Sequence, residues 1–355
     1  MDAPTFHQLM AGVEGLGVFP EVPLDDSPGL WSDLGDAMSV QLSLGILRAL
    51  AKGNAAVALV AHRRALVQWV LTVCGAADEV TSMIPVDKVA FASTGHHGLG
   101  RESLGAWIAQ GPLLPDDVSM LGDWLDRSHA SQVWASPGWQ GLLWPCWRDG
   151  LVQWCVQPRH ALLVQRGAHP LGLSELEIGA VCSRTAVHDG EADSSLVWRS
   201  SLDAEVSRQL LANVLKMEFL AAMAMGLGVQ DRGAALAREF AGIRRQGGTL
   251  IERHPAVQQM LCDIAASQHQ LQNLLGAFGR PLHELSLTDI ALTRKASSDA
   301  LVHACHQVIQ VHGGLGYMRD AGPEKLVRDQ HMLRWMAGGV AALPLLLSGL
   351  QRSQA

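Results

Sequence analysis

Two glycine-rich segments in the second half of the sequence carry residue types suited to binding a phosphate-bearing ligand. Residues 310–317 read "QVHGGLGY", and residues 244–248 read "RRQGG". Glycines let a backbone approach a ligand closely and leave amide groups free for phosphate oxygens. An arginine and a glutamine beside a glycine pair can grip a pyrophosphate. The first segment is equally compatible with an ordinary glycine stop at a helix end. It is not a dinucleotide-binding fingerprint, because it follows a helix rather than a strand.

Long helices must position these segments, and the apolar periodicity predicts such helices from residue 201 onward. One helix covers residues 207–230 and continues or restarts through 231–245. Three more are predicted at residues 256–278, 286–311 and 323–336. Four long helices with apolar stripes are typical of an antiparallel bundle.

The residues before the bundle divide into two regions of different character. Residues 36–74 are rich in Ala and Leu and contain a helix break at Gly53-Asn54. From about residue 88 to 200, short apolar runs alternate with Gly and Pro, which predicts a compact antiparallel sheet or barrel. Residues 101–109 look helical within it. We therefore expect a mainly α protein with a β domain, divided into residues 1–86 (helical), 87–200 (β-rich) and 201–355 (four-helix bundle).

Composition and charge exclude several classes of protein. The chain has 355 residues, 48% of them hydrophobic, and a net charge of −7 without a basic cluster, so we expect no nucleic-acid partner. The N-terminus lacks the pattern of a secretory signal, and the longest apolar run, residues 336–350, is shorter than a membrane span. The six cysteines show no metal-binding spacing. We therefore expect a cytoplasmic protein with reduced, buried thiols, no membrane contact and no metal site.

Four sequence elements together resemble the C-terminal bundle of the acyl-CoA dehydrogenase family. They are residues 244–248, 254–261, 310–317 and the pair Arg328-Asp329, and they occur in the order and spacing of the family. The resemblance implies the family's fold, with a helical N-terminal domain that is shortened here, a central β domain and a C-terminal four-helix bundle. It also implies a homodimer or homotetramer with FAD at a subunit interface.

Specific cofactor contacts follow from the same resemblance. The family's matching arginine and Gly-Gly-x-Gly segment hold the diphosphate and adenosine of FAD bound to a neighbouring protomer. Carried over, the contacts are Arg244, Gln246, Gln310, Gly313 and Gly314. The alternatives are a solvated helix-end cation for Arg244 and a helix-cap amide for Gln310.

The middle of the chain departs from the family pattern. The family's Thr-Glu-Pro-x-x-Gly-Ser-Asp and Trp-Ile-Thr-Asn motifs, which grip the flavin ring, are absent. The segments "FASTG" (residues 91–95) and "VWASPG" (133–138) stand nearest to them. The central part of the sequence therefore indicates flavin binding less strongly than the C-terminal bundle does.

The family's catalytic base is also missing from its usual loop. Many relatives carry a glutamate there, but this chain has Ala337, which cannot accept a proton. Some relatives place the base on a bundle helix instead, and counting back from Arg244 puts that position at Glu218. Glu218 is the one acid in the apolar run "KMEFLAAMAM", so we expect desolvation to raise its pKa toward neutrality, as a general base requires. The alternative is a surface glutamate beside Lys216.

The resemblance implies α,β-dehydrogenation of an acyl thioester carried on CoA or a carrier protein. Glu218 would take the α-proton while the flavin accepts the β-hydride. The electron acceptor would be an electron-transfer flavoprotein or O2. Two alternatives stay open: an oxygen-using flavin enzyme on the same scaffold, such as a hydroxylase or oxidase, and a non-catalytic relative that acts as an assembly subunit.

Overall fold

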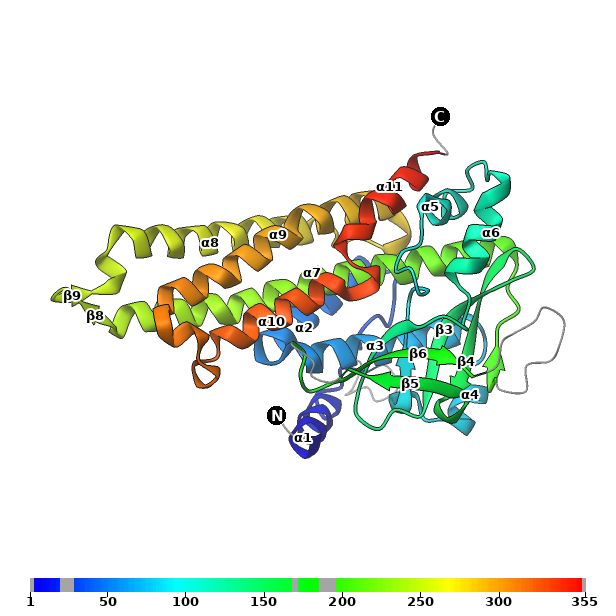
Figure 1. Cartoon of the computed structure of the whole chain (residues 1–355), viewed down its shortest axis with the longest axis horizontal. Coiled ribbons are helices and arrows are strands. Elements are labelled where there is room, and N and C mark those ends of the chain that lie inside the picture. The colour runs from blue at the N-terminus through cyan, green and yellow to red at the C-terminus, as the bar shows by residue number, and fades with distance from the viewer. Residues whose placement is uncertain (1–2, 20–28, 168–171, 185–195, 353–355) are drawn as a thin grey trace.

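The chain is described from a computed structural model that covers residues 3–19, 29–167, 172–184 and 196–352. The expectation of no secretory signal concerns a stretch that begins with residues 1 and 2, and these two residues lie outside the described range. The long axis of the molecule runs from the end of a helical bundle, marked by β8 and β9, to a β-containing region at the other end (Figure 1).

Four helices form the N-terminal part: α1 (Ala3–Glu14), α2 (Ala37–Gly53), α3 (Ala55–Val73) and α4 (Ala77–Met83). Asp36 caps α2 by accepting a hydrogen bond from the Ser39 amide. Asn54 caps α3 by accepting from the amides of residues 56 and 57. A side-chain cap satisfies amides that have no partner inside a helix. The predicted break at Gly53-Asn54 is therefore confirmed.

The β-containing part has two small sheets. Their strands are β1 (Val89–Phe91), β2 (Ser131–Ala135), β3 (Gly141–Arg148), β4 (Leu151–Pro158), β5 (Leu162–Arg166), β6 (Glu177–Ser183) and β7 (Trp198–Arg199). The orders are β1-β3-β4-β7 and β2-β6-β5. All pairs are antiparallel except β1 with β3, so the expectation of one antiparallel sheet or barrel was wrong in detail. The β3–β4 hairpin turns at Asp149-Gly150, both at positive φ, as tight hairpin turns require.

Two helices interrupt the strands: α5 (Glu102–Ile108), which was predicted, and α6 (Pro115–Trp124), which was not. Short 3₁₀ turns join many of the elements. They are η1 (Val86–Lys88), η2 (Arg159–Ala161), η3 (Ile251–Arg253), η4 (Leu282–Glu284), η5 (Gly313–Tyr317), η6 (Arg319–Ala321), η7 (Met336–Gly338) and η8 (Val340–Ala342).

The C-terminal part confirms the predicted four-helix bundle. It consists of α7 (Ala204–Ile243), α8 (Pro255–Gly276), α9 (Leu287–His312) and α10 (Pro323–Trp335). The hairpin β8 (Arg245–Gln246) and β9 (Thr249–Leu250) joins α7 to α8, and α11 (Leu343–Gln351) packs on α5. The first helix does not restart at Asp231 but runs unbroken for 40 residues.

The middle of α7 is buried on all sides because it packs against α2, α3, α9 and α10. By length and composition, α3 and α7 are apolar enough to cross a membrane, as is the bent pair formed by residues 323–338 and 340–351. Within the fold, however, 67% of the apolar window of α3 and 89% of that of α7 are buried. Their apolar surface forms the protein core.

Candidate active site

A cavity of about 440 Å³ lies where the three parts of the chain meet. Arg63 of α3 lines one wall, and Trp134 of β2 lines another. The loop after β1 and the loop after α10 complete it. The full lining is Arg63, residues 92–98, Ala130, Gln132, Trp134, Ala180 and residues 335–338. The segments "FASTG" and "VWASPG", which the sequence placed nearest to the missing flavin motifs, therefore both contribute to this cavity.

Three buried polar atoms on the cavity lining have no hydrogen-bond partner in the described part of the chain. They are Nε of Arg63, Nδ1 of His96 and Nε1 of Trp134. Leaving such an atom unpaired costs about 1–3 kcal/mol. Native proteins keep few of them, and each needs an explanation. A ligand with oxygen or nitrogen atoms in the cavity would supply the missing partners.

Ala337 lies in the cavity wall, within η7. Its backbone is left-handed, with φ 48° and ψ 54°, and Gly338 and Gly339 follow at φ 82° and 79°. The Arg294 guanidinium donates a hydrogen bond to the Met336 carbonyl and holds the start of this turn. The loop in which relatives carry a glutamate thus faces the cavity, but it presents a methyl group there.

Glu218 is fully buried on α7, and three side chains donate hydrogen bonds to its carboxylate. His62 Nε2 lies 3.0 Å from Oε1. Arg63 Nη2 and Ser93 Oγ lie 2.9 and 3.0 Å from Oε2. The indole of Trp31 donates to His62 Nδ1 at 3.0 Å, which fixes the proton of a neutral imidazole on Nε2, facing Glu218. This one carboxylate therefore joins three elements, which are α3, the loop after β1 and α7.

The expected rise in the pKa of Glu218 was wrong. Burial by itself raises the pKa, but the charge of Arg63 and the hydrogen bonds from His62 and Ser93 together lower it below the ordinary value. The alternative of a surface glutamate is also wrong, since Glu218 has no exposed surface. Lys216 is buried as well, and its ammonium donates to the Leu282 carbonyl rather than to Glu218.

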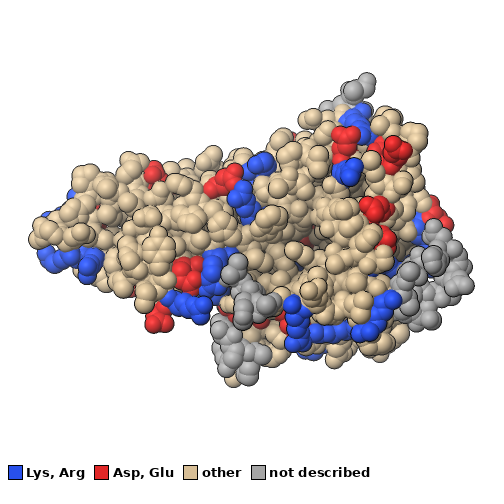
Figure 2. Space-filling view, viewed as in Figure 1, with Lys and Arg blue, Asp and Glu red and all other residues tan. Residues whose placement is uncertain are grey.

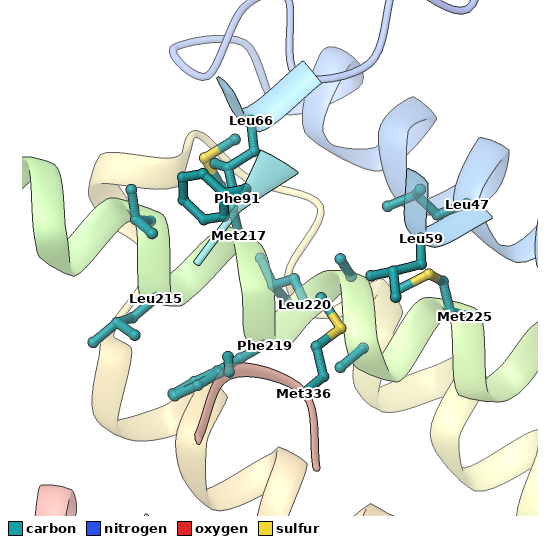
Figure 3. Close-up of a cluster of buried hydrophobic side chains, with 14 of the residues drawn as sticks. Leu47, Leu59, Leu66, Phe91, Leu215, Met217, Phe219, Leu220, Met225 and Met336 are labelled. Carbon is teal, nitrogen blue, oxygen red and sulfur yellow. The ribbon is translucent and has the colours of Figure 1, made fainter. Parts of the chain in front are cut away.

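Hydrophobic side chains separate Glu218 from bulk water. Figure 3 shows Phe91 of β1 close to Met217, and Phe219 and Leu220 close to the turn that carries Met336. The Arg294 guanidinium lies 4.6 Å from the centre of the Phe219 ring, and burial lowers its pKa to about 10, so it stays charged at neutral pH. Glu218 itself does not line the cavity, but its partners Arg63 and Ser93 do.

Sequence reasoning missed His62, Arg63 and Ser93, which hold Glu218. A signal was present, because His62 and Arg63 stand inside a mostly apolar helix and α3 buries twelve of its residues. A histidine or arginine in such a helix needs a buried acidic or polar partner. Only the folded chain shows that this partner is Glu218, 155 residues farther along for Arg63.

The residues expected to contact FAD lie at the other end of the bundle. Arg244 and Gln246 are exposed next to the β8–β9 hairpin, and Figure 2 shows basic side chains at that end. Phe240 stacks on His312 at 4.6 Å between ring centres, which brings the Arg244 segment beside the glycine segment after α9. Within the described residues, the side chains of Arg244 and Gln310 make no hydrogen bond or ion pair.

The glycines at this end leave open space. A Cβ atom added to any of four glycines, Gly247, Gly248, Gly313 or Gly314, would meet no heavy atom within 4 Å. Exposed cationic and amide side chains beside open, glycine-rich backbone suit an anionic ligand. The structure brings the five expected contact residues to one end of the bundle. The β-containing part, which supplies most of the cavity lining, lies at the other end of the molecule (Figure 1).

The Arg328-Asp329 pair has a structural role in this chain. Asp329 accepts a hydrogen bond from the Leu173 amide at 2.7 Å and pairs with Lys325. Gly172 packs so tightly on α10 that an added Cβ would stand 2.3 Å from the Arg328 carbonyl oxygen. The pair therefore anchors the β-containing part to the bundle.

Comparison with known proteins supports the motif-based resemblance. Residues 208–342 match the family described as acyl-CoA dehydrogenase, C-terminal domain. A probable acyl-CoA dehydrogenase of Bacillus subtilis is 34% identical over 116 residues, which is 32% of this chain and 30% of the relative. The aligned segment thus spans about a third of that curated relative.

Solved structures extend the likeness to the whole chain. A glutaryl-coenzyme A dehydrogenase in complex with glutaryl-CoA superposes with a TM-score of 0.71 at 14% identity, covering 97% of this chain and 87% of the other. A structure described as an FAD-dependent dehydrogenase gives 0.69 at 16% identity and covers 98% of both chains. The predicted fold is confirmed.

Proposed function

Because residues 208–342 match the C-terminal domain of acyl-CoA dehydrogenases and the whole chain has the fold of solved acyl-CoA dehydrogenases, we propose that this protein is an FAD-dependent oxidoreductase that acts on an acyl thioester. The observation that carries the proposal is the cavity between the three parts of the chain, whose walls hold unpaired buried polar atoms on Arg63, His96 and Trp134. The reaction is α,β-dehydrogenation. The electrons pass to an electron-transfer flavoprotein or to O2.

The residues present fit FAD at both ends of the molecule. In the cavity, the Trp134 indole and Arg63 Nε offer N–H donors to ring carbonyl oxygens, and Ser93, Thr94 and Gln132 add further polar groups. At the bundle end, Arg244, Gln246 and Gln310 stand beside the open backbone of Gly313 and Gly314. When bound, FAD supplies hydride acceptance at its flavin ring.

A second copy of the chain is part of this proposal. The hairpin β8–β9 beside Arg244 and the β-containing part that lines the cavity lie at opposite ends of the molecule (Figure 1), so the proposal assigns the two sites around one FAD molecule to different protomers. A neighbouring protomer that brings its own bundle end to the cavity would complete the site. The expected assembly is a homodimer or homotetramer.

Glu218 is the proposed proton acceptor. Its lowered pKa keeps the carboxylate ionised at neutral pH, which a base needs before it takes a proton. Arg63 links this carboxylate to the cavity, because Nη2 donates to Glu218 while Nε is unpaired on the lining. A ligand oxygen that draws Arg63 toward the cavity would weaken its hold on Glu218 and raise the proton affinity of the carboxylate.

A second candidate follows from the same geometry. Glu218 is fully enclosed by three donors, and Ala337 offers no proton acceptor. These observations favour a protein of this fold without an α-proton base. It would be either an oxygen-using flavin enzyme or a non-catalytic assembly subunit that binds no flavin.

The test begins with the absorbance spectrum of the purified protein, which reports bound flavin. A panel of acyl-CoA esters is then mixed anaerobically with wild type and with Glu218→Gln. We expect flavin reduction by at least one ester in wild type and a loss on the order of 10²-fold or more in the variant. Glu205→Gln, an exposed change on the same helix, is the matched control.

The outcomes separate the candidates. Equal rates in wild type and Glu218→Gln remove Glu218 from the mechanism. A flavin that no ester reduces, but that is reoxidised rapidly by O2 after reduction with NAD(P)H, favours the oxygen-using enzyme. A colourless protein that takes up no added FAD overturns the proposal in favour of the non-catalytic subunit.

A further inference from the structure

We propose that His96, Asp123 and His129 form a binding site for a divalent transition-metal ion such as Zn²⁺ at the edge of the cavity. Each residue offers one ligand atom, and the three atoms all lie within 4.8 Å of one another. His96 is also part of the cavity lining.

The fold holds two of these residues side by side. A Cβ atom added to Gly95 would stand only 1.7 Å from the Trp124 carbonyl oxygen, so the loop touches the end of α6. Trp124 is buried, and its indole donates to the Gly98 carbonyl at 2.8 Å. These contacts fix the backbone on both sides of His96 directly beside Asp123. A metal site needs this kind of rigid support around its ligands.

The His96 ring is arranged as a ligating histidine would be. The ring lies next to the Trp124 backbone, and its Nδ1 is buried and has no partner among the described residues. Histidines that bind metals commonly donate one ring N–H to a carbonyl or carboxylate, and the other nitrogen then presents its lone pair to the ion. A bound metal ion would give this buried nitrogen the partner that it lacks.

Neighbouring side chains can orient the other two ligands. His97 Nε2 lies 3.1 Å from Asp123 Oδ2, and His129 Nδ1 lies 3.6 Å from Asp126 Oδ2. The ring of His96 lies 3.8 Å from that of His97 and 4.5 Å from that of His129, measured between centres. Two carboxylates and three imidazoles thus gather in one small volume.

The donor set indicates the class of ion. Two imidazoles and one carboxylate suit Zn²⁺ and the neighbouring divalent ions of the first transition row. Ligand atoms about 2.1 Å from a tetrahedral metal ion lie about 3.4 Å apart. The three atoms here, which lie within 4.8 Å of one another, therefore need to close by up to about 1.4 Å. The exposed side chains of Asp123 and His129 have room to make this movement.

Three protein ligands leave a coordination position free, as in catalytic rather than structural zinc sites. Because His96 lines the cavity, that position is within reach of a carbonyl or anionic oxygen on a ligand in the cavity. The residues come from three separate places in the sequence and show no spacing motif. This explains why sequence analysis predicted no metal site.

The test titrates Co²⁺ and then Zn²⁺ into chelator-treated protein. It uses a Cys262→Ser background, because Cys262 is an exposed free thiol that would bind either ion. We expect one equivalent of Co²⁺ with visible absorption bands, displaced by Zn²⁺, and zinc binding in calorimetry. Asp123→Asn and His129→Ala should each weaken binding at least tenfold. His97→Ala, which removes only an orienting contact, should weaken it less.

The matched control is His303→Ala, which changes an exposed histidine on α9. No binding, or binding that His303→Ala weakens as much as His129→Ala does, overturns the proposal. The titration detects the metal directly and needs neither flavin nor substrate. Failure of this site and failure of the proposed oxidoreductase activity are therefore seen in separate measurements.

Discussion

Arg63 on α3 donates a 2.9 Å hydrogen bond to Glu218 on α7. Arg63 lines the cavity, and Glu218 lies behind this lining. Glu218 has no exposed surface, and the Arg63 side chain is 11% exposed. Removing one partner of a buried ion pair leaves the other charge without compensation. This single contact therefore links the stability of the fold to the chemistry of the cavity.

Arg63→Met should destabilise the protein by about 3–5 kcal/mol, because the Glu218 carboxylate would be buried with only two neutral donors. The midpoint of urea unfolding measures the change. The control is Arg148→Met, which breaks an exposed pair with Asp149 and should change stability by about 0.5 kcal/mol or less. A loss below about 1 kcal/mol for Arg63→Met would show that Glu218 does not depend on Arg63.

His62 should make the protein less stable as the pH falls. Burial lowers the pKa of His62 below its ordinary value near 6.5, so the folded state holds it neutral. A group whose pKa is depressed by folding contributes stability above its unfolded pKa and loses it as the pH falls toward the folded pKa. Stability should therefore decline below about pH 6.5 in wild type and decline less steeply in His62→Asn. Urea midpoints between pH 5 and 8 measure both slopes, and identical slopes would contradict the assignment.

Arg244→Ala should weaken FAD binding by about 10- to 100-fold, the loss of a charged hydrogen bond worth about 1.5–3 kcal/mol. The loss of bound FAD is measured as the ratio of flavin absorbance to protein absorbance while the protein is diluted. Arg280→Ala, an exposed arginine in the loop after α8, is the control. Unchanged occupancy in Arg244→Ala would exclude a diphosphate contact at this end of the bundle.

Ala337→Glu should place a proton acceptor in the cavity wall. Alanine and glutamate meet the same backbone strain at φ 48°, since both carry a Cβ atom, so the turn should keep its shape. In a Glu218→Gln background we expect anaerobic flavin reduction by an acyl-CoA to recover at least tenfold. Ala337→Gln in that background fills the same space without a base. Equal rates in the two double variants would show that the recovery is not acid–base chemistry.

Gly105→Ala should destabilise the packing of α5 on α11. Its Cβ would stand 2.2 Å from the Leu346 carbonyl oxygen, a backbone atom that cannot move without shifting α11. Overpacking of this kind costs about 1–3 kcal/mol. Gly45→Ala in α2, where a Cβ meets nothing within 4 Å, should instead stabilise the protein by up to about 1 kcal/mol. Thermal unfolding should show a lower midpoint temperature for Gly105→Ala and a higher one for Gly45→Ala. Shifts in the same direction would contradict the close contact at Gly105.

The sequence by itself determined the four helices of the bundle, the order of the three parts and the resemblance of the bundle to the C-terminal domain of acyl-CoA dehydrogenases. These features depend on local patterns: apolar residues at helical spacing, caps such as Asn54, and glycine motifs such as residues 310–317. Such patterns act over a few turns of chain and can be read before folding. The strand pairings were less predictable, because β1 pairs in parallel with β3, about fifty residues away.

The tertiary structure alone decided the environment of the ionisable groups. The sequence showed Glu218 among apolar residues and so predicted a raised pKa, but the fold brings Arg63, His62 and Ser93 to its carboxylate and lowers it. The cluster of His96, Asp123 and His129 likewise exists only because the Gly95 loop packs on the end of α6. A pKa or a ligand set depends on distances of a few ångströms between residues far apart in the chain, and those distances are fixed only when the core packs.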